Sequence, residues 1–270
     1  MLEKKVAVIT GAGSGIGRSV ATVFAEQKAN MLLIGRDEEK LKRVQTEIQR
    51  NHKVDVIIAS ADVGNSSAIK KAIEKGHHHF GSLDILSHNA AIFPRSLLTD
   101  LQEAEWNDVL RINLSGTLYT LQAIQPFMIE QKSGNIVLTS SVAGTVFGLP
   151  AMASYAASKA GLDGLMKTAA LELSPYHIRV NSVCPSATLT FEVDTPEKQE
   201  IVNRVAAVNP LKRWATPREV ATSILFLASD LSSYINGHCL VIDGGQSALA
   251  EPHHISPEYL ENHGTRPKSP

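Results

Sequence analysis

Short apolar runs alternate with longer amphipathic stretches along most of the chain. The apolar runs are nearly continuous, which is typical of strands buried on both faces of a parallel sheet. They lie at residues 5–10, 31–34, 55–59, 83–87, 135–139, 179–183 and 239–242. Their alternation with helical patterns predicts an α/β fold, doubly wound, with about seven parallel strands and helices on both faces.

Helical periodicity fills the spaces between these runs. The predicted helices span residues 16–27, 38–50, 66–79, 103–130, 155–174 and 217–228. Residues 186–210 contain Pro and Thr and interrupt the alternation, so we expect a mobile loop or lid there. No repeat or linker divides the chain. We therefore predict a single domain over residues 1–249 and a polar, Pro-rich, poorly packed tail over residues 250–270.

The composition is ordinary for a globular protein. The chain has 270 residues, of which 43% are hydrophobic and 20% charged, enough for one large domain. A net charge of −1 gives no basic surface for nucleic acid or an anionic membrane. No apolar run approaches the ~20 residues that span a bilayer. We therefore expect neither nucleic acid nor a membrane as a partner.

Two features bear on the cellular compartment. The chain reaches a predicted strand and a glycine turn so early that no room remains for a signal peptide. Its only cysteines, Cys184 and Cys239, have no CxxC spacing and no obvious metal-binding neighbours. We therefore expect two reduced thiols in a cytoplasmic protein.

Consecutive histidines at His77, His78 and His79 suggest a metal site at first sight. Three successive helical residues spread over about 200° of arc, however, and cannot converge on one ion. We expect a solvated helix end at this run, and we expect His253 and His254 in the tail to face solvent. No metal site is predicted.

A glycine-rich turn follows the first predicted strand and opens the first predicted helix. It follows a GxxxGxG spacing at Gly11, Gly15 and Gly17, and Ile16 breaks the GxGxxG spacing of dinucleotide-binding turns. A plain structural turn is therefore an alternative. The position between a strand and a helix N-terminus favours a pyrophosphate site, because backbone N–H groups and the helix dipole face the anion there.

Tyr155 and Lys159 are four residues apart in a predicted helix, so both side chains share one face. Free tyrosine ionises near ~10 and lysine slightly higher, and neither suits proton transfer at neutral pH. A buried cation beside a tyrosine favours the phenolate, lowers its pKa and makes it a usable general acid or base. The alternative is an incidental pair on a helix surface.

Five motifs occur in the order and approximate spacing of one enzyme family. They are TGAGSGIG at 10–17, HNAA at 88–91, Asn113, SSVAG at 140–144 and YAASK at 155–159. With RVNSVCP at 179–185 and FLASDLSSYINGHCLVIDGG at 226–245, the chain resembles the classical short-chain dehydrogenase/reductase family over roughly residues 4–247. The resemblance implies a Rossmann-type fold, an NAD(P)(H) cofactor and carbonyl–alcohol redox chemistry.

The resemblance also implies catalytic roles. Tyr155 would transfer the proton, and Lys159 would act as its electrostatic partner and hold the nicotinamide ribose. Ser141 would polarise the substrate carbonyl, with Ser140 as its rival. The Ser141–Tyr155 separation is fourteen residues, one more than is usual in the family, and alignment on the following V-A-G selects Ser141. Asn113 would anchor a water that links Lys159 to solvent, or else only cap or kink a helix.

The implied cofactor contacts extend along the whole domain. They are Gly11, Ser14, Gly15, Ile16, Gly17, Arg36, Asp62, Val63, Asn89, Ala90, Tyr155, Lys159, Pro185, Thr188 and Thr190. Four positions depart from the family pattern without removing a catalytic group: His88, Ala91, Ser186 and Ala215. We interpret His88 as a packing or hydrogen-bonding variant and not as a catalytic base.

The end of the second predicted strand bears on the choice of cofactor. NAD enzymes usually carry an acidic residue where this chain has Gly35, which leaves room for a phosphate. Arg36 follows and could grip a 2′-phosphate through charge-assisted hydrogen bonds. Asp37 could instead reach the ribose, and Ser14 stands where some NADP enzymes carry a second basic residue. We therefore predict a preference for NADP(H), with NAD(H) possible.

These observations predict an NADP(H)-dependent oxidoreductase that interconverts a small-molecule carbonyl, either ketone or aldehyde, and an alcohol. The alternatives are a non-catalytic dinucleotide-binding sensor or scaffold, and an NAD-dependent dehydrogenase of the same family. An isomerase or lyase of the superfamily is disfavoured, because little chain follows Val183 to form a larger substrate domain. We expect a homotetramer, or at least a homodimer, that pairs the helices at 103–130 and 155–174.

Overall fold

The computed structural model describes residues 1–248 and confirms the predicted seven-stranded parallel fold. The strands are β1 (Val6–Thr10), β2 (Asn30–Gly35), β3 (Val56–Ser60), β4 (Ile85–His88), β5 (Gly134–Thr139), β6 (Ile178–Pro185) and β7 (Cys239–Ile242). Their order in the sheet is β3-β2-β1-β4-β5-β6-β7. The strand order reverses between β1 and β4, and the crevice at the carboxyl ends there is where open α/β sheets bind ligands.

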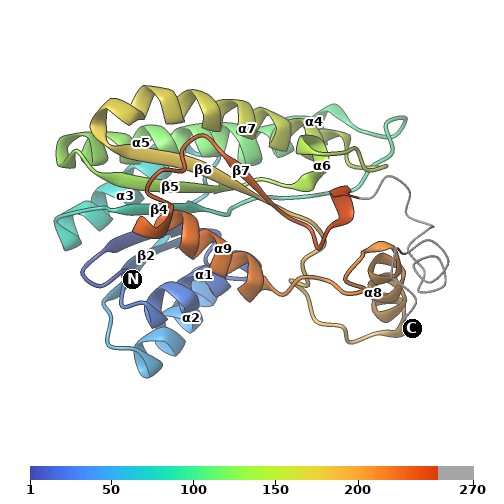
Figure 1. Ribbon diagram of the computed structural model, residues 1–270, viewed down its shortest axis with the longest axis horizontal. Helices are drawn as coiled ribbons and strands as arrows, with labels where there is room; N and C mark the ends of the chain where they lie inside the picture. Colours follow the sequence, from blue (N-terminus) through green and yellow to red (C-terminus); the bar gives the residue numbers. More distant parts are fainter. Residues whose placement is uncertain (249–270) are drawn as a thin grey trace, which may run out of the picture.

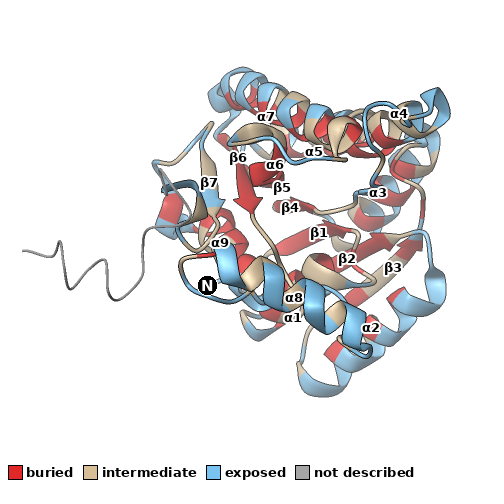
Figure 2. Ribbon diagram, turned by 90° about the vertical axis from the view of Figure 1, so that its right-hand side faces the viewer, coloured by how far each residue is buried: buried red, intermediate tan, exposed pale blue. Residues whose placement is uncertain are grey.

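Helices cover both faces of the sheet, as Figure 1 shows. One layer contains α3 (Ser66–Phe80), α5 (Gly116–Gln131) and α7 (Ala153–Leu173), and the other contains α1 (Gly15–Glu26), α2 (Glu38–Asn51) and α9 (Pro217–Ala228). Each layer closes its own apolar core against the sheet. Figure 2 shows the buried strands between these layers and the exposed outer sides of the helices. This double cover explains why the strands read as continuous apolar runs.

The helix predicted over residues 103–130 consists of three elements. A π-helical turn at Arg111–Ser115 separates α4 (Glu103–Leu110) from α5. Within this turn the side chain of Asn113 is bonded to the backbone of Ile92, and Thr117 Oγ1 donates to the Asn113 carbonyl at 2.7 Å. Single π-turns inside helices are frequent at functional sites, and this turn contains a predicted catalytic residue.

The segment predicted as a mobile loop or lid contains a helix, α8 (Pro196–Val208), so it is not a loop throughout. Thr195 caps the helix by accepting from the Lys198 amide at 3.3 Å, and Pro196 occupies the first turn. This start signal is visible in the sequence. None of the residues of α8 is buried, and the helix lies apart from the two main layers in Figure 1. The remaining short elements are α6 (Val142–Thr145), η2 (Ser174–Tyr176), η3 (Asp230–Ser232) and η4 (Gln246–Ala248).

The prediction of two reduced thiols was wrong, because Cys184 and Cys239 form a disulfide. The two cysteines lie on the neighbouring strands β6 and β7, with Cys239 opposite Ser182 and therefore two residues from Cys184 in register. Their Cα atoms are 6.4 Å apart, within the range that a disulfide spans. The two cysteines are 55 residues apart in the sequence, so the sequence alone does not show that they are close in space.

The histidine run does not simply end in solvent. His77 stacks on Phe127 with ring centroids 4.2 Å apart, and His79 Nε2 lies 2.7 Å from an Asp55 carboxylate oxygen. His78 is exposed. The three side chains therefore have different surroundings, as the helical arc requires.

The tail at residues 250–270, with His253 and His254, lies outside the described residues, as does residue 249 at the predicted domain boundary. Among residues 1–248, no helix is long and apolar enough to cross a bilayer.

Candidate active site

Tyr155 and Lys159 lie in the first turns of α7, as the four-residue spacing predicts. Lys159 is buried, its Nζ donates to the Thr139 carbonyl at 2.6 Å, and this Nζ lies 5.6 Å from the centroid of the Tyr155 ring. Thr139 is the last residue of β5, so the lysine joins α7 to the carboxyl end of the sheet. A surface pair would show neither the burial nor this bond.

The two serines in the turn after β5 make different hydrogen bonds. Ser141 adopts an extended conformation at the start of α6, and its Oγ accepts from the Ala143 amide at 3.1 Å. Because that bond uses a lone pair, the Ser141 hydroxyl hydrogen can be directed to Tyr155 or to a substrate oxygen. Ser140 points instead to Asp163, to which it donates at 2.9 Å. The geometry therefore favours Ser141 over Ser140 as the hydroxyl that reaches the substrate.

A glycine allows this turn to pack against α7. Gly144 has a φ of +91°, which disfavours any other residue. A Cβ at this position would also collide with the carbonyl oxygen of Ala156, the residue after Tyr155. The SSVAG motif is therefore a packing motif as well as the carrier of Ser141.

Asn113 makes three side-chain hydrogen bonds inside the protein. Its Nδ2 donates to the Ile92 carbonyl at 2.9 Å and to Ser158 Oγ at 3.1 Å, while its Oδ1 accepts from the Ile92 amide at 2.9 Å. Ser158 in turn donates to the Tyr155 carbonyl at 2.7 Å. Asn113 thus ties the segment after β4 to α7 beside both Tyr155 and Lys159.

The electrostatic environment differs from the expected one. Burial raises the pKa of Tyr155, and a hydrogen bond with Ser141 offsets only part of this effect. The Lys159 ammonium lies 5.6 Å from the ring centroid, yet the pKa of Tyr155 is raised overall, contrary to the expectation from the sequence. Tyr155 is therefore protonated at neutral pH, the state in which a phenol can donate a proton.

Lys159 itself has a strongly perturbed pKa. Burial lowers it to about 8, and the negative charge of Asp163 acts in the opposite direction. The lysine therefore remains mostly charged at neutral pH and loses its charge in mildly alkaline solution.

His88 lies at the end of β4 and is buried. Its Nδ1 is 3.1 Å from Thr10 Oγ1, whereas its Nε2 has no partner among the described residues. Burial lowers the pKa of His88 to about 3, and the charge of Lys159 adds to this. The imidazole is therefore neutral, in keeping with a hydrogen-bonding variant and not with a base.

Thr10 organises the neighbouring cofactor segment. Its Oγ1 accepts from the amides of Asn89 and Ala90 at 3.0 and 3.2 Å. A Cβ on Gly11 would lie 2.9 Å from the Ala90 nitrogen, so only glycine permits this close approach of the β1 and β4 ends. Gly11, Asn89 and Ala90, which are far apart in the sequence, thus form one surface.

The first turn of α1 fits the pyrophosphate of a dinucleotide. Ser14 makes no capping bond, so the amides at the start of this helix are available to an anion. Gly15, Ile16 and Gly17 form the first turn, and a Cβ on Gly17 would collide with the Gly11 carbonyl. The residues at the first turn of α1 can therefore accommodate the predicted dinucleotide pyrophosphate.

Residues from the other strand ends complete this region. A Cβ on Gly15 would lie 3.3 Å from Thr190, which brings the segment after β6 against the glycine turn. Pro185 ends β6, and Thr188 pairs with Ala215 and donates to the Ser186 carbonyl at 3.0 Å. The predicted cofactor contacts after β6 thus lie on the same side of the molecule as α1.

Asp62 and Val63 follow β3. Burial alone would raise the pKa of Asp62, but hydrogen bonds from the Gly64 amide and the Arg111 guanidinium lower it overall. Val63 is buried and packs against Gly116. A Cβ on Gly116 would lie 2.9 Å from Val63 Cγ2. Both residues therefore also hold the start of α5.

Two charged residues with different surroundings lie at the end of β2 and the start of α2. Asp37 caps α2 by accepting from the Lys40 amide at 3.1 Å, and it also pairs with the Lys40 ammonium. Arg36 is exposed, and none of the side-chain hydrogen bonds or ion pairs found within residues 1–248 uses its guanidinium. Asp37 is therefore occupied, while Arg36 is available at the end of β2.

Exposed apolar side chains surround the crevice on the segments that follow β4, β5 and β6. We call Phe93, Val146, Leu149 and Phe191 the apolar rim. The Phe93 ring makes an edge contact with Tyr155, with centroids 6.2 Å apart. Ser96 pairs with Met152, which joins two of these segments.

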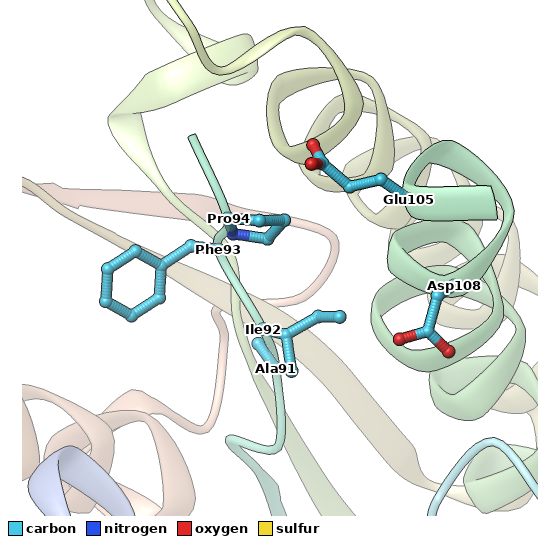
Figure 3. A pocket seen from close by; sticks show the side chains of 6 residues that line it. All are labelled: Ala91, Ile92, Phe93, Pro94, Glu105 and Asp108. Carbon is cyan, nitrogen blue, oxygen red and sulfur yellow. The ribbon is translucent and has the colours of Figure 1, made fainter. Parts of the chain in front are cut away.

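A hollow of about 500 Å³ lies between α4 and residues 91–94. Figure 3 shows Glu105 and Asp108 on the α4 side of this hollow, while the Phe93 ring points away from that helix. Tyr155, Ser141 and Lys159 do not line it. The hollow is therefore separate from the catalytic side of residues 91–94.

Several functional neighbours were not predicted from the sequence: Thr10, Thr139, Ser158 and Asp163. Thr10 and Ser158 lie inside quoted motifs and could have been found there. Asp163 lies one helical turn after Lys159, which was the only available signal.

Comparisons with known proteins agree with this geometry. The family model described as "Enoyl-(Acyl carrier protein) reductase" matches residues 11–247. The chain is 39% identical over 248 residues to a 3-oxoacyl-(acyl-carrier-protein) reductase of Thermotoga maritima, covering 90% of this chain and 98% of that protein. A protein of the same description from Staphylococcus aureus is 38% identical over 246 residues, with 91% and 99% covered.

Solved structures show the same likeness. Levodione reductase superimposes with a TM-score of 0.88 at 31% identity, covering 92% of this chain and 99% of that one. An NAD⁺-bound xylitol dehydrogenase superimposes with a TM-score of 0.85 at 29% identity, with 90% and 99% covered.

Proposed function

The chain belongs to the classical short-chain dehydrogenase/reductase family and is an oxidoreductase acting on CH–OH groups, and we propose that it interconverts a carbonyl and an alcohol with NADP(H). The observation that carries the proposal is the assembly of Ser141, Tyr155 and Lys159 around one point at the carboxyl end of β5. A purely dinucleotide-binding scaffold would not need a protonated tyrosine hydrogen-bonded to a serine at that point.

Each side chain has a distinct task in the proposed reduction. Tyr155 donates its phenolic proton to the alkoxide that develops on the substrate. Ser141 donates a hydrogen bond to the carbonyl oxygen, since its own oxygen already accepts from the Ala143 amide. Lys159 provides a nearby positive charge that stabilises the phenolate left on Tyr155. A bound nicotinamide dinucleotide supplies the hydride.

Asn113 supports these groups in the proposal. Its bonds to Ile92 and Ser158 fix α7 relative to the segment after β4. The predicted water between Asn113 and Lys159 would supply a proton to the site from solvent. Two of the three Lys159 N–H groups lie outside the bond to Thr139 and can serve that water and a ribose hydroxyl.

Arg36 supports NADP(H) as the cofactor. Its guanidinium has no hydrogen-bond or ion-pair partner within residues 1–248, and the neighbouring carboxylate of Asp37 is used in capping α2. The first-turn amides of α1 serve the pyrophosphate. An NAD-dependent dehydrogenase is the alternative function, and the similarity to an NAD⁺-bound xylitol dehydrogenase is the observation in its favour.

The apolar rim supports an uncharged carbonyl substrate with an apolar body. Relatives and similar structures include 3-oxoacyl-thioester and levodione reductases and a xylitol dehydrogenase. The proposal favours the first two kinds of substrate, because a polyol would bury little of the exposed apolar surface of Phe93 and Phe191 against apolar groups.

We further propose a homotetramer, or at least a homodimer. Leu118 on α5 is 37% exposed and Leu171 on α7 is 76% exposed, so both helices carry apolar side chains on their outer faces. Burial of these faces against a second copy would remove them from water.

Initial rates with a substrate panel test the proposed function. The panel contains a 3-oxoacyl thioester, a cyclic ketone and xylitol, each assayed with NADP(H) and NAD(H) in the appropriate direction. We expect reduction of an apolar ketone or oxoacyl thioester with NADPH. A faster reaction of xylitol with NAD⁺ would support the alternative and contradict the proposal.

A further inference from the structure

Asp163 is a buried carboxylate without a role in the proposed reaction. It lies on α7, one helical turn beyond Lys159, and is 5% exposed. Buried carboxylates are rare unless several hydrogen bonds satisfy them. Its partners therefore indicate what it does.

Three hydroxyl groups from three elements converge on this carboxylate. Ser140 donates to Oδ2 at 2.9 Å, Thr145 donates to the same oxygen, and Ser182 donates to Oδ1 at 2.8 Å. An ionised carboxylate only accepts, so all three hydroxyls must donate to it. Their directions are thereby fixed.

Two of these hydroxyls flank the turn that carries Ser141. Ser140 precedes Ser141 directly, and Thr145 ends the short helix α6 that begins after it. Asp163 therefore holds the turn at both ends against α7. Because Ser140 is bound in this way, only Ser141 has a hydroxyl available to Tyr155.

The charge of Asp163 also acts on Lys159, which lies on the same helix. Burial lowers the pKa of the lysine, and the Asp163 carboxylate is the group that raises it. Three kinds of titratable group around the pair are uncharged. His88 on β4 is neutral, Tyr155 is protonated, and the cysteines of β6 and β7 are joined. Helix α4, which packs against α7, carries Glu105 and Asp108.

A metal site is a competing explanation. Asp163, Cys184 and Cys239 have ligand-type atoms within 4.8 Å of one another. The sulfurs are joined as a disulfide and cannot act as thiolates, and the carboxylate is occupied by three hydroxyl donors. The hydrogen-bonding explanation therefore accounts for the whole cluster.

We propose that Asp163 is a positioning residue for the reaction, which holds the turn carrying Ser141 through Ser140 and Thr145 and places a negative charge one helical turn from Lys159. This inference rests on the proposed function, since Ser141 and Lys159 act in it. It assigns two separable effects to one side chain, one through geometry and one through charge.

Kinetics separate the two effects. Asp163→Asn preserves the volume but removes the charge and an acceptor, and Ser140→Ala loosens the turn while it keeps the charge. We expect both variants to lower kcat at least about tenfold with KM for the cofactor within about twofold. Only Asp163→Asn should move the alkaline limb of the pH profile, by about one pH unit toward lower pH. Thr222→Ala, a control that removes an exposed hydroxyl on α9 outside this cluster, should stay near the wild-type kcat.

A measurement without turnover covers the case in which the proposed function fails. The Cε signal of Lys159 is titrated by NMR in ¹³C-lysine-labelled wild type and Asp163→Asn, and Lys159→Met assigns it. We expect a lower midpoint in Asp163→Asn. An unchanged midpoint would overturn the effect of charge, whether or not a substrate is turned over.

A different result would overturn the positioning of Ser141 by Asp163. A folded Asp163→Asn that loses only melting temperature, with wild-type kcat and pH profile, would make Asp163 a structural residue. If Asp163→Asn does not fold, the double variant Ser140→Ala, Thr145→Val decides. A wild-type kcat in that variant would overturn the positioning role.

Discussion

Replacing Arg36 by alanine tests the cofactor proposal most directly. The guanidinium lies at the end of β2, where the neighbouring Asp37 is used in capping α2. We expect Arg36→Ala to weaken the use of NADPH and to leave NADH nearly unchanged, because only NADPH carries a phosphate on the adenosine ribose.

The magnitude follows from the exposure of the site. A hydrogen bond to a charged group is worth roughly 1.5–3 kcal/mol, which corresponds to about 10- to 150-fold in affinity. Arg36 is exposed, so solvent and salt screen its charge and place the effect near the lower end. We therefore expect kcat/KM with NADPH to fall about tenfold, and with NADH less than about twofold.

The assay measures initial rates with each cofactor at a fixed carbonyl concentration and at two ionic strengths. The loss with NADPH should be smaller at high salt. Arg50→Ala is a matched control, because Arg50 lies in the last turn of α2 and carries the same charge. Equal losses with both cofactors, or a wild type that prefers NADH, would refute the reasoning.

The reciprocal change is Gly35→Asp, which introduces the acidic residue typical of NAD enzymes. A Cβ at this position would lie 3.3 Å from Leu41 Cδ2, so only the end of a leucine side chain must shift. We expect the cofactor order to reverse in this variant. Retention of the NADPH preference would mean that the end of β2 does not set specificity.

Three further predictions concern the reaction and the assembly. Tyr155→Phe should lower kcat about 10²–10⁴-fold while cofactor binding, followed by fluorescence, persists; more than a tenth of the wild-type kcat would exclude the assigned role. The rate of reduction should decline above about pH 8 as Lys159 loses its charge, while His88, with a pKa of about 3, should add no transition near neutrality; a pH profile that is flat up to about pH 10 would contradict this. Light scattering at micromolar concentration should give a dimer or tetramer, and a 29.1 kDa particle would disprove the proposed assembly.

The sequence by itself was sufficient for the sheet and the main motifs. Strands buried on both faces must be apolar throughout, so β1 to β7 could be read as continuous runs. The Tyr155–Lys159 pair follows from helical periodicity, and the glycine turn follows from its place between a strand and a helix. These features depend on residues close together in the chain.

The boundaries of some elements depended on contacts that the sequence does not show. The helix predicted over 103–130 contains a π-turn, in which the Asn113 side chain is bonded to the backbone of Ile92. The helix α8 was missed although Thr195 and Pro196 mark its start. The first error has a tertiary cause, whereas the second was a start signal overlooked in a segment that contains Pro and Thr.

Only the tertiary structure decided the electrostatics of the site. Tyr155 was expected to have a lowered pKa, but burial raises it, and Lys159 lies over the ring. Cys184 and Cys239 were expected to be free thiols, but the pairing of β6 with β7 joins them. Asp163 gathers hydroxyls from three elements. Burial and contacts between distant residues set these properties, and a one-dimensional pattern of residue types encodes neither.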